Sequence, residues 1–366
     1  MIDLARIVLK GFKSIREMDL ELRDLNILIG ANGSGKSNLI AFFTLLNQIV
    51  SGDLQLYVGK SGGADALLHF GRRRTDKLQC RLWLPQSGYR FSLVPAARDA
   101  LIFSEENWFH PDTDLFGAGA HVSVARVSEK GYAETAVDSL RAQDHEFALK
   151  VMEHPARWRV YHFHDTTDAA KMKQTCDIND NQFLRPEAGN LASVLYLLKE
   201  RYPEHYRNIV DSIRMVAPFF DDFNLHPSGL NELKIRLEWR ERGTDTYFGP
   251  EALSDGSLRF ICLATLLLQP ELPTLILIDE PELGLHPAAV TLCASLLKSA
   301  STKTQVITCT QSVTLVNQFE PANIVVVDRE EGQSTFRRLP EEGFKDWMED
   351  YGLGDLWEKN VLGGRP

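Results

Sequence analysis

The stretch "LNILIGANGSGKSNLIAFFTLLNQIV", residues 25–50, decides the fold. Its first residues form an apolar run that predicts a buried strand ending at Gly30, and residues 37–50 carry the apolar spacing of a helix. Between them, "GANGSGKS" follows the pattern Gly-x-x-x-x-Gly-Lys-Ser. When a strand precedes this pattern and a helix follows it, the loop cradles phosphate groups. The sequence therefore predicts a phosphate loop at residues 30–37.

Each residue type in this loop has a chemical reason. The glycines permit backbone angles that turn successive N–H groups toward phosphate oxygens. Lys36 supplies a positive charge to the β- and γ-phosphates, and the Ser37 hydroxyl is a ligand for Mg²⁺. The alternative, a glycine-rich turn that matches by accident, does not account for the flanking strand and helix. The predicted binding residues are Gly30, Asn32, Gly33, Ser34, Gly35, Lys36, Ser37 and Asn38.

A second acidic motif, "TLILIDEPELGLHP", occupies residues 274–287. Its apolar run predicts a buried strand that presents Asp279 at its carboxyl end, where open α/β sheets bind ligands. We expect Asp279 to hold Mg²⁺ and Glu280 to accept a proton from an attacking water, as a general base does. The alternative is an acidic strand exit without a catalytic role.

The segment "LSDGSLRF", residues 253–260, places a polar turn before an apolar helix. A helix start has unpaired N–H groups and the positive end of the helix dipole, so Ser254 and Gly256 could bind an anion. An ordinary N-cap explains the same residues, because Ser and Asp are preferred caps. We call residues 253–257 the serine turn.

Composition sets broad limits. The chain has 366 residues, of which 44% are hydrophobic and 25% are charged, as in soluble globular proteins. No apolar run reaches the length of a membrane span, and the N-terminus does not have the layout of a signal peptide. Five dispersed cysteines form neither a disulfide framework nor a zinc pattern, which favours a cytoplasmic protein. The net charge of −10 argues against a surface that is basic all over.

Alternating strands and helices after residue 250 predict an α/β fold with a mainly parallel sheet flanked by helices. Short strands before the phosphate loop predict an antiparallel β subdomain near the N-terminus. We expect a discontinuous core, residues 1–50 and 250–340, a mixed α/β insertion at 51–249, and a tail at 341–366. Within the insertion, strands are predicted at "LQCRLWL", "YRFSLV", "HVSVARV" and "LKIRLEW", and a helix is predicted at residues 133–154.

The head domain of ABC-type ATPases resembles this chain in four stretches. In chain order they are "GFKSI" at residues 11–15, the phosphate loop, the serine turn and "DEPELGLHP" at residues 279–287. The likeness is greatest to the SMC/RecF/OLD-like branch, that is, to AAA_21-like bacterial predicted ATPases. It covers residues 1–50 and 250–330 closely and the middle of the chain loosely. The resemblance implies ATP and Mg²⁺ as cofactors, with Lys13 near the nucleotide. For Lys10 and Lys13, a solvated strand edge remains the alternative.

In that family two heads dimerise head-to-tail, and the serine turn of each caps the γ-phosphate held by the other. The resemblance places Glu282, Gly284, Leu285 and His286 at the dimer seam, although His286 before Pro287 also suits a helix entry. The family usually has a histidine sensor after the next strand, where this chain has Gln311. Because an amide cannot carry charge, slow hydrolysis or a switch biased towards the ATP-bound state is expected. No residue is assigned to the family's Q-loop glutamine; Gln48 and Gln55 are not placed at a strand end.

Two weaker patterns remain open. Arg72, Arg73 and Arg74 could contact a nucleic-acid backbone, or they could form a solvated turn. His162 and His164 would share one face of a strand, as in a metal site, but no third ligand has convincing spacing, so polar-face histidines are favoured.

The resemblance implies a cytoplasmic, Mg²⁺-dependent ATPase that forms a homodimer on ATP and does not contact a membrane. The stretch after residue 312 is too short for the TOPRIM-type nuclease of OLD proteins, and no heptad arm is present. We therefore expect a switch in prokaryotic anti-phage defence that controls a separately encoded effector, a nuclease. The alternative is a RecF-like clamp that binds double-stranded DNA in repair.

Overall fold

The computed structural model describes residues 2–110, 131–137, 142–340, 344, 347 and 350–365. The predicted strand "HVSVARV" and residues 138–141 of the predicted helix 133–154 lie outside the described residues. The described part of that helix begins at α4 (Ala142–Ala156), and residues 131–136 are not helical.

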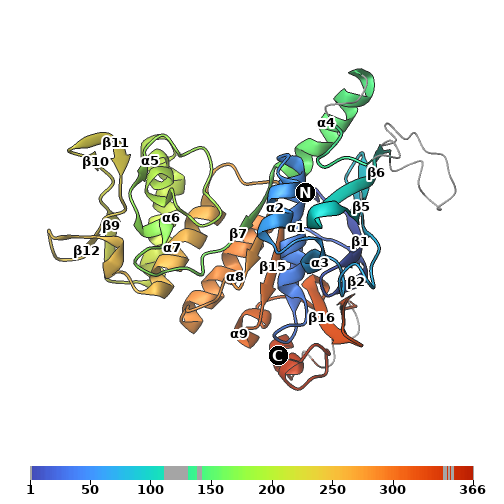
Figure 1. Cartoon of the computed structure of the whole chain (residues 1–366). Coiled ribbons are helices and arrows are strands. Elements are labelled where there is room, and N and C mark those ends of the chain that lie inside the picture. The colour runs from blue at the N-terminus through green and yellow to red at the C-terminus, as the bar shows by residue number, and fades with distance from the viewer. Residues whose placement is uncertain are drawn as a thin grey trace.

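A six-stranded sheet forms the centre of the molecule (Figure 1). Its order is β17-β16-β3-β15-β14-β7, and all neighbouring strands are parallel except β17, which pairs antiparallel with β16. The strands are β3 (Leu25–Ile29), β7 (Trp158–Tyr161), β14 (Leu275–Asp279), β15 (Gln305–Thr310), β16 (Ile324–Glu330) and β17 (Gln333–Arg338).

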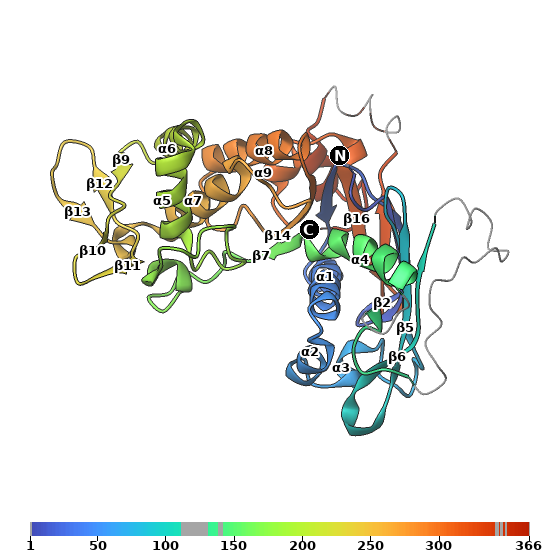
Figure 2. The same ribbon diagram turned by 90° about the horizontal axis from the view of Figure 1, so that it is seen from above.

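Both faces of this sheet are buried. Ile276 and Ile278 of β14 belong to one hydrophobic cluster, and Leu275 and Leu277 belong to a second cluster on the opposite face, as expected for a strand of period two. Helices α7 (Asp255–Leu268) and α8 (Pro287–Ser301) contribute to the first cluster, whereas α1 (Lys36–Val50) contributes to the second. The views in Figures 1 and 2 show α8 and α1 on either side of the sheet. This double cover explains why these strands read as continuous apolar runs.

A second, five-stranded sheet is antiparallel, with the order β2-β1-β4-β5-β6. It packs beside the α1 face of the central sheet, and the short helices α2 (Leu54–Lys60) and α3 (Ala64–Leu67) lie near it. The strands are β1 (Arg6–Phe12), β2 (Ile15–Glu21), β4 (Leu78–Trp83), β5 (Gly88–Pro95) and β6 (Leu101–Phe109).

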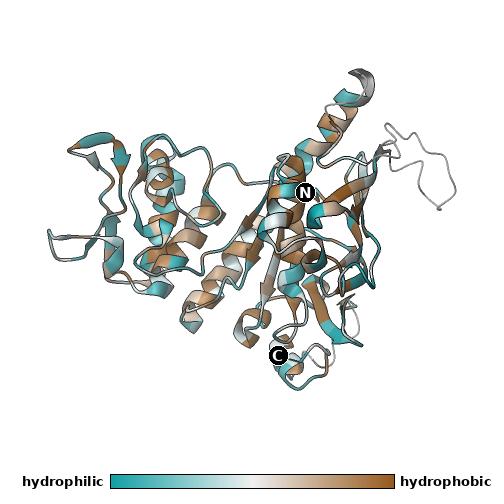
Figure 3. Ribbon diagram, in the orientation of Figure 1, coloured by the Kyte–Doolittle hydropathy of each residue, from teal (hydrophilic) through white to brown (hydrophobic). Residues whose placement is uncertain are grey.

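A helical lobe and outer hairpins lie at the other end of the molecule (Figure 2). The lobe consists of α5 (Leu191–Arg201) and α6 (Pro203–Val216), and Pro203 occupies the first turn of α6, where its missing N–H costs nothing. Figure 3 shows hydrophobic residues concentrated on the central strands and the helices beside them, whereas the outer hairpins are mostly hydrophilic. The short strands of this end are β8 (Cys176–Asp177), β9 (Phe220–Phe223), β10 (Pro227–Ser228), β11 (Asn231–Ile235), β12 (Trp239–Glu241) and β13 (Tyr247–Phe248).

The α/β class is confirmed, and one predicted strand needs correction. Strands of the segment 51–249 join the sheets of the core, because β7 pairs with β14 and β4 pairs with β1. The strand predicted at "LKIRLEW" is divided between β11 and β12, which belong to different small sheets. Helix α9 (Val313–Val316) precedes β16, and helix α11 (Leu353–Glu358) follows β17; the two helices pack against each other.

Candidate functional site

The phosphate loop connects β3 to α1, as the sequence predicts. Gly35, at the N-cap of α1, has φ +117°, and a Cβ at this position would collide with Ser334 Oγ. Only glycine fits this close approach. Lys36 is buried, and its Nζ donates to the carbonyl oxygens of Gly30 (2.5 Å) and Ala31 (3.0 Å). Burial lowers the pKa of Lys36, although neighbouring acidic groups oppose this. The ammonium is therefore held inside the loop and is poorly solvated.

A set of hydroxyl groups supports the loop from outside. Ser334 Oγ of β17 donates to the carbonyl oxygen of Ser34 (2.5 Å) and lies 2.6 Å from Ser14 Oγ. Asn38 Nδ2 donates to the same Ser14 oxygen (2.6 Å). Asn38 thus orients the first turn of α1, while Asn32, Gly33 and Ser37 are exposed at the mouth of the loop.

The carboxyl end of β14 brings the acidic motif to the loop. Ser37 Oγ lies 3.3 Å from Asp279 Oδ2. Burial raises the pKa of Asp279 and the charge of Glu280 adds to this effect, whereas His164 and His162 oppose it. A partly desolvated carboxylate beside a hydroxyl is a pair of oxygen ligands that favours a hard cation.

Glu280 is restrained by its backbone and its side chain. Its φ of +46° lies in the left-handed region, which is rare for a non-glycine residue and is found at functional sites. Its N–H donates to the carbonyl oxygen of Cys309 (2.9 Å). Gln311 Nε2 donates to Glu280 Oε1 (2.6 Å). The structure thus brings the predicted base and the predicted sensor into direct contact.

Glu282, expected at a dimer seam, turns inward. Its Oε1 accepts hydrogen bonds from Thr310 Oγ1 (2.5 Å) and the Gln311 N–H (3.2 Å). Burial raises the pKa of Glu282. Glu282 therefore fixes the backbone of Gln311 through this hydrogen bond. Its neighbours Gly284 and His286 are exposed, and His286 is the N-cap of α8, as expected for a helix entry.

The two histidines after β7 lie beside Asp279. His164 Nε2 is 2.9 Å from the carbonyl oxygen of Asp279, and burial lowers the pKa of His162, an effect that the nearby Asp279 charge opposes. Within the described residues no group of three His, Cys, Asp or Glu side chains could hold a metal ion. The histidines thus lie beside the strand end that carries Asp279.

The serine turn leads into α7; its Ser254 and Asp255 are exposed, whereas Leu253 is buried in the core. Ser254 Oγ accepts from the Ser257 N–H (3.2 Å), so it is the N-cap. A Cβ on Gly256 would collide with the carbonyl oxygen of Gly284, so the turn packs closely on the segment after Glu280. Arg259, one turn further along α7, donates to the carbonyl oxygens of His164 (2.8 Å) and Leu283 (3.3 Å). Arg259 therefore connects the helix that follows the serine turn to two segments beside Asp279, the one after β7 and the one after β14.

A cavity of about 820 Å³ adjoins the phosphate loop. We call it the loop-side cavity; it is lined by Lys13, Ser14, His69, Phe70, Arg73 and Arg329, among others. Arg329 also donates to the carbonyl oxygen of Gly33 (3.4 Å). Burial lowers the pKa of Lys13, whereas Lys10 pairs with Glu17 (2.5 Å) away from the cavity.

The arginine cluster is largely paired within the chain. Arg72 forms ion pairs with Asp65 (2.9 Å) and Asp99, and Arg74 lies over the ring of Phe70 (5.7 Å). These contacts favour a structured wall of the cavity over a nucleic-acid patch. Gln55 donates to the carbonyl oxygens of Leu101 and Ala133, so its role is structural.

The comparisons with known proteins agree with this architecture. Residues 90–317 match the family model described as "AAA domain, putative AbiEii toxin, Type IV TA system". This range includes the serine turn and the acidic motif, and the phosphate loop precedes it. No curated protein matches the chain.

Two solved structures share the fold. One is an Smc head bound to the C-terminal winged-helix domain of ScpA, with 16% identity, a TM-score of 0.61, and coverage of 95% of this chain and 100% of that chain. The other is an Smc head with an extended coiled coil bound to the C-terminal domain of ScpA from Pyrococcus furiosus. It has 17% identity, a TM-score of 0.56, and coverage of 96% of this chain and 99% of that chain.

Because the family model matches more than half of the chain, the protein belongs to this family of AAA ATPase domains. It is an ATPase that binds ATP, built on a fold similar to that of Smc heads. No helix in the described part of the chain is both long and apolar enough to span a membrane.

Sequence reasoning missed three features of the site. Arg259, Ser334 and the loop-side cavity depend on contacts between distant segments. The pattern "LSDGSLR" signals Arg259 only through its place one turn into α7, and nothing local marks Ser334.

Proposed function

We propose that the protein is an ATP-dependent switch in which two copies associate head-to-tail, with each nucleotide held between the phosphate loop of one copy and the serine turn of the other. One observation carries this proposal: Ser254 and Asp255 of the serine turn are exposed at the start of α7, and α7 and α1 cover opposite faces of the central sheet. A helix N-terminus that is open to solvent and capped only by its own serine can accept an anion from a second molecule.

Within one copy, each loop residue then has a defined task. Backbone N–H groups of residues 33–37 bind phosphate oxygens, and Lys36 exchanges its two carbonyl partners for the β- and γ-phosphates. A poorly solvated ammonium gains more from this exchange than an exposed one, because its competing hydration is already lost. Glu280 accepts the proton of the attacking water, and Gln311 holds the Glu280 carboxylate and donates toward the γ-phosphate.

The residues also suit Mg²⁺. Magnesium in ATPases is held by one or two protein oxygens together with the phosphates of the nucleotide, so a cluster of three carboxylates is not required. Ser37 and Asp279 provide such a pair. When bound, the ion neutralises charge on the phosphates; His164 keeps the Asp279 backbone in place.

The loop-side cavity is the place for the nucleoside. It opens beside the phosphate loop, since Ser14 contacts Asn38 and Arg329 contacts Gly33. The ring of Phe70 is 56% exposed there and offers a stacking surface. Lys13 lies on the same wall, which supports its assignment to the nucleotide site.

The γ-phosphate, which ATP has and ADP lacks, explains why the two copies would associate with ATP and separate after hydrolysis. ATP offers an anion to the partner's serine turn and ADP does not, so hydrolysis removes the contact that joins the two copies. Arg259 would carry this change to the carbonyl groups of His164 and Leu283 beside the acidic site.

For the biological role, we propose control of a separately encoded effector in prokaryotic defence. The family description refers to a toxin–antitoxin system, and the two Smc heads of the same fold are bound to a separate partner, ScpA. A RecF-like clamp on double-stranded DNA is the alternative. The ion pairs of Arg72 with Asp65 and Asp99 leave less positive charge for it.

Mixing two defective variants tests the composite site. Lys36→Ala removes the phosphate ligand and Ser254→Glu repels the γ-phosphate, so each variant alone should neither dimerise with ATP nor hydrolyse it. Mixed together, they can form one intact site from the Lys36 of one copy and the Ser254 of the other. We expect the mixture to regain ATP-dependent dimers in sedimentation and a fraction of the turnover.

Two controls complete the experiment. The double variant carrying both changes, mixed with either single variant, cannot build an intact site and should stay inactive. Ser295→Glu places the same charge on the exposed surface of α8 and should behave like wild type. If Ser254→Glu alone dimerised and hydrolysed ATP normally, the proposal of a site shared between copies would be wrong.

A further inference from the structure

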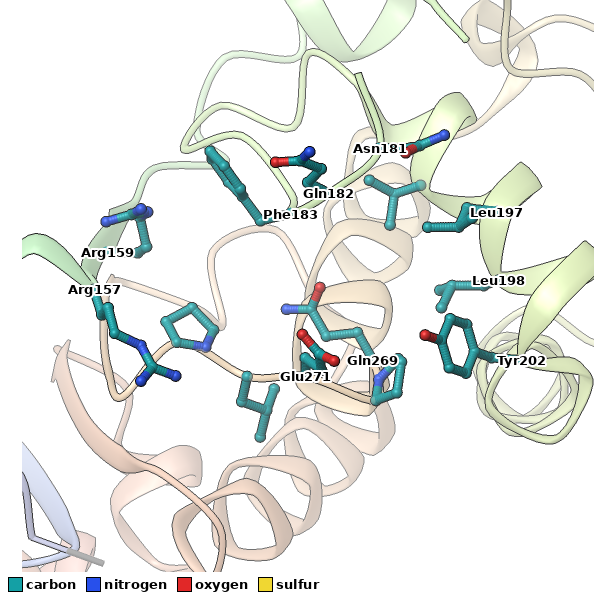
Figure 4. A pocket seen from close by; sticks show the side chains of 14 residues that line it. Arg157, Arg159, Asn181, Gln182, Phe183, Leu197, Leu198, Tyr202, Gln269 and Glu271 are labelled. Carbon is teal, nitrogen blue, oxygen red and sulfur yellow. The ribbon is translucent and has the colours of Figure 1, made fainter. Parts of the chain in front are cut away.

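A second cavity, of about 510 Å³, lies at the edge of the central sheet opposite the nucleotide site. We call it the Gln269 cavity (Figure 4). Arg157 and Arg159 line it at the amino end of β7, and residues 269–273 line it just before β14 begins. The phosphate loop and Asp279 instead follow the carboxyl ends of their strands. Because parallel strands place all amino ends at one edge, the two sites are separate.

The opposite wall comes from the helical lobe. Val194, Leu197 and Leu198 of α5 provide an apolar surface, and Tyr202 follows them. The cavity therefore lies between the central sheet and the lobe. Its volume is within the range of small-molecule sites.

A buried amide faces this cavity without a partner. Gln269 is only 7% exposed, and its Nε2 has no hydrogen-bond partner among the described residues. Figure 4 shows the amide nitrogen on the side of the cavity where Arg157, Arg159 and Phe183 lie. An unmade hydrogen bond of a buried N–H group is costly, so a ligand that supplies an acceptor is favoured.

The charged residues that line the Gln269 cavity favour a negatively charged hydrogen-bond acceptor. Arg159 is fixed, because its Nη1 donates to the carbonyl oxygens of Ala156 (2.6 Å) and Trp158 (2.8 Å) and its guanidinium lies over the ring of Phe183 (5.1 Å). No ion pair or side-chain hydrogen bond of Arg157 occurs within the described part of the chain. Glu271, which is exposed at the rim, is the one acidic residue that lines the cavity, so the described wall has an excess of positive charge.

We propose that the Gln269 cavity binds a small organic anion, with its carboxylate or phosphate group held by Arg157, Arg159 and Gln269 Nε2 and its apolar body against Leu197, Leu198 and Tyr202. Guanidinium groups bind both acid types through paired N–H donors, so the two share one recognition chemistry. This binding does not require nucleotide and is independent of the switch proposed above.

The test uses four probes of similar size on the purified chain without nucleotide. Benzoate and phenyl phosphate carry the two candidate acid groups, benzamide is neutral, and benzylamine is cationic. Ligand-observed NMR should detect at least one of the two anions binding, and it should show which acid group is preferred. We expect benzamide and benzylamine to bind at least about tenfold more weakly, since one lost charged hydrogen bond already has this effect.

Variants then locate the site. Arg157→Glu should reduce anion binding at least about tenfold, and Glu271→Gln should strengthen it, because the two changes alter the local charge in opposite directions. Lys36→Ala, at the phosphate loop, should leave it unchanged. Both changes at the cavity affect exposed residues, so an unaltered melting temperature checks that the variants are folded.

Three results would overturn the proposal: neither anion binds, benzamide binds as well as benzoate, or Arg157→Glu leaves anion binding unchanged. Binding of phenyl phosphate that is lost only with Lys36→Ala would assign the probe to the phosphate loop and would also contradict it.

Discussion

Gln311 Nε2 donates to Glu280 Oε1 across 2.6 Å, and this bond joins two residues that come from neighbouring strand ends of the central sheet. Glu282, in turn, accepts from the Gln311 backbone and from Thr310. The proposed base is thus held in place by the residue at the position where the sequence resemblance leads one to expect a histidine. A neutral amide performs this positioning. It can donate a hydrogen bond to a phosphate, but it carries no positive charge.

Substitution of Gln311 should therefore act more strongly on turnover than on ATP affinity. Gln311→Ala releases the Glu280 carboxylate and should lower kcat about tenfold or more, in the range of a mispositioned base. Gln311→His restores a group that can carry charge and should raise kcat above that of wild type. Steady-state phosphate release, with ATP affinity measured separately, checks both; a histidine variant no faster than wild type would contradict the expected role of the glutamine.

Glu280→Gln should separate association from hydrolysis. The amide keeps the shape of the side chain but cannot accept the proton of water, so ATP should bind normally and persist. We expect kcat to fall at least about a hundredfold, as when a general base is removed, and dimers to accumulate with ATP but not with ADP. Sedimentation velocity measures this, and a variant that stays monomeric at saturating ATP would argue against the shared site.

Gly256→Ala should affect association without affecting nucleotide binding. The added methyl group would collide with the carbonyl oxygen of Gly284 and displace the serine turn. We expect ATP-dependent dimers to be lost while ATP affinity stays unchanged. Gly229→Ala is the matched control, because a Cβ there meets no atom within 4 Å. Unchanged dimerisation of Gly256→Ala would mean that the turn does not need its close approach to Gly284.

Asp3 should contribute stability that depends on pH. Burial alone would raise its pKa, but hydrogen bonds with His154, Trp158 and Thr274 more than offset this, and the pKa of Asp3 lies below its ordinary value of 3.8. A lowered carboxylate pKa stabilises the fold above the ordinary value, and this stability is lost as the pH falls through the folded pKa.

Asp3→Asn should therefore lower the free energy of unfolding at pH 7 by about 2 kcal/mol, the scale of hydrogen bonds to a charged group. Its cost should shrink below pH 4. Urea unfolding across this pH range measures the effect, and Asp76→Asn, at an exposed aspartate, is the control. An equal loss at low and neutral pH would show that the Asp3 charge is not responsible.

The residues closest to the predicted chemistry were the easiest to find from the sequence. Lys36, Asp279 and Glu280 lie in short motifs whose flanking strands are apolar on both faces, and the structure places all three at one edge of the sheet. Their roles stay predictions. The parallel strands were visible because a strand buried on both sides must be apolar throughout.

The supporting contacts were not predictable for a physical reason. Ser14 and Ser334 meet through a hydroxyl contact between strands that are far apart in the chain, and neither residue has a local pattern. β7 has only four residues, so no periodicity could place it beside β14. The resemblance places Glu282 at the dimer seam, yet its side chain accepts a hydrogen bond from Thr310 on the neighbouring strand.

Helix α7 spans 14 residues, or about 21 Å, and it is continuous from Ser254 to the residue before Gln269. Such a rod compresses little along its axis, and its last carbonyl group is anchored to α6 through His205. The residue next to Gln269 and the serine turn are therefore the two ends of one continuous helix. A single helix thus connects the edge of the central sheet that carries the Gln269 cavity to the edge that carries the nucleotide site.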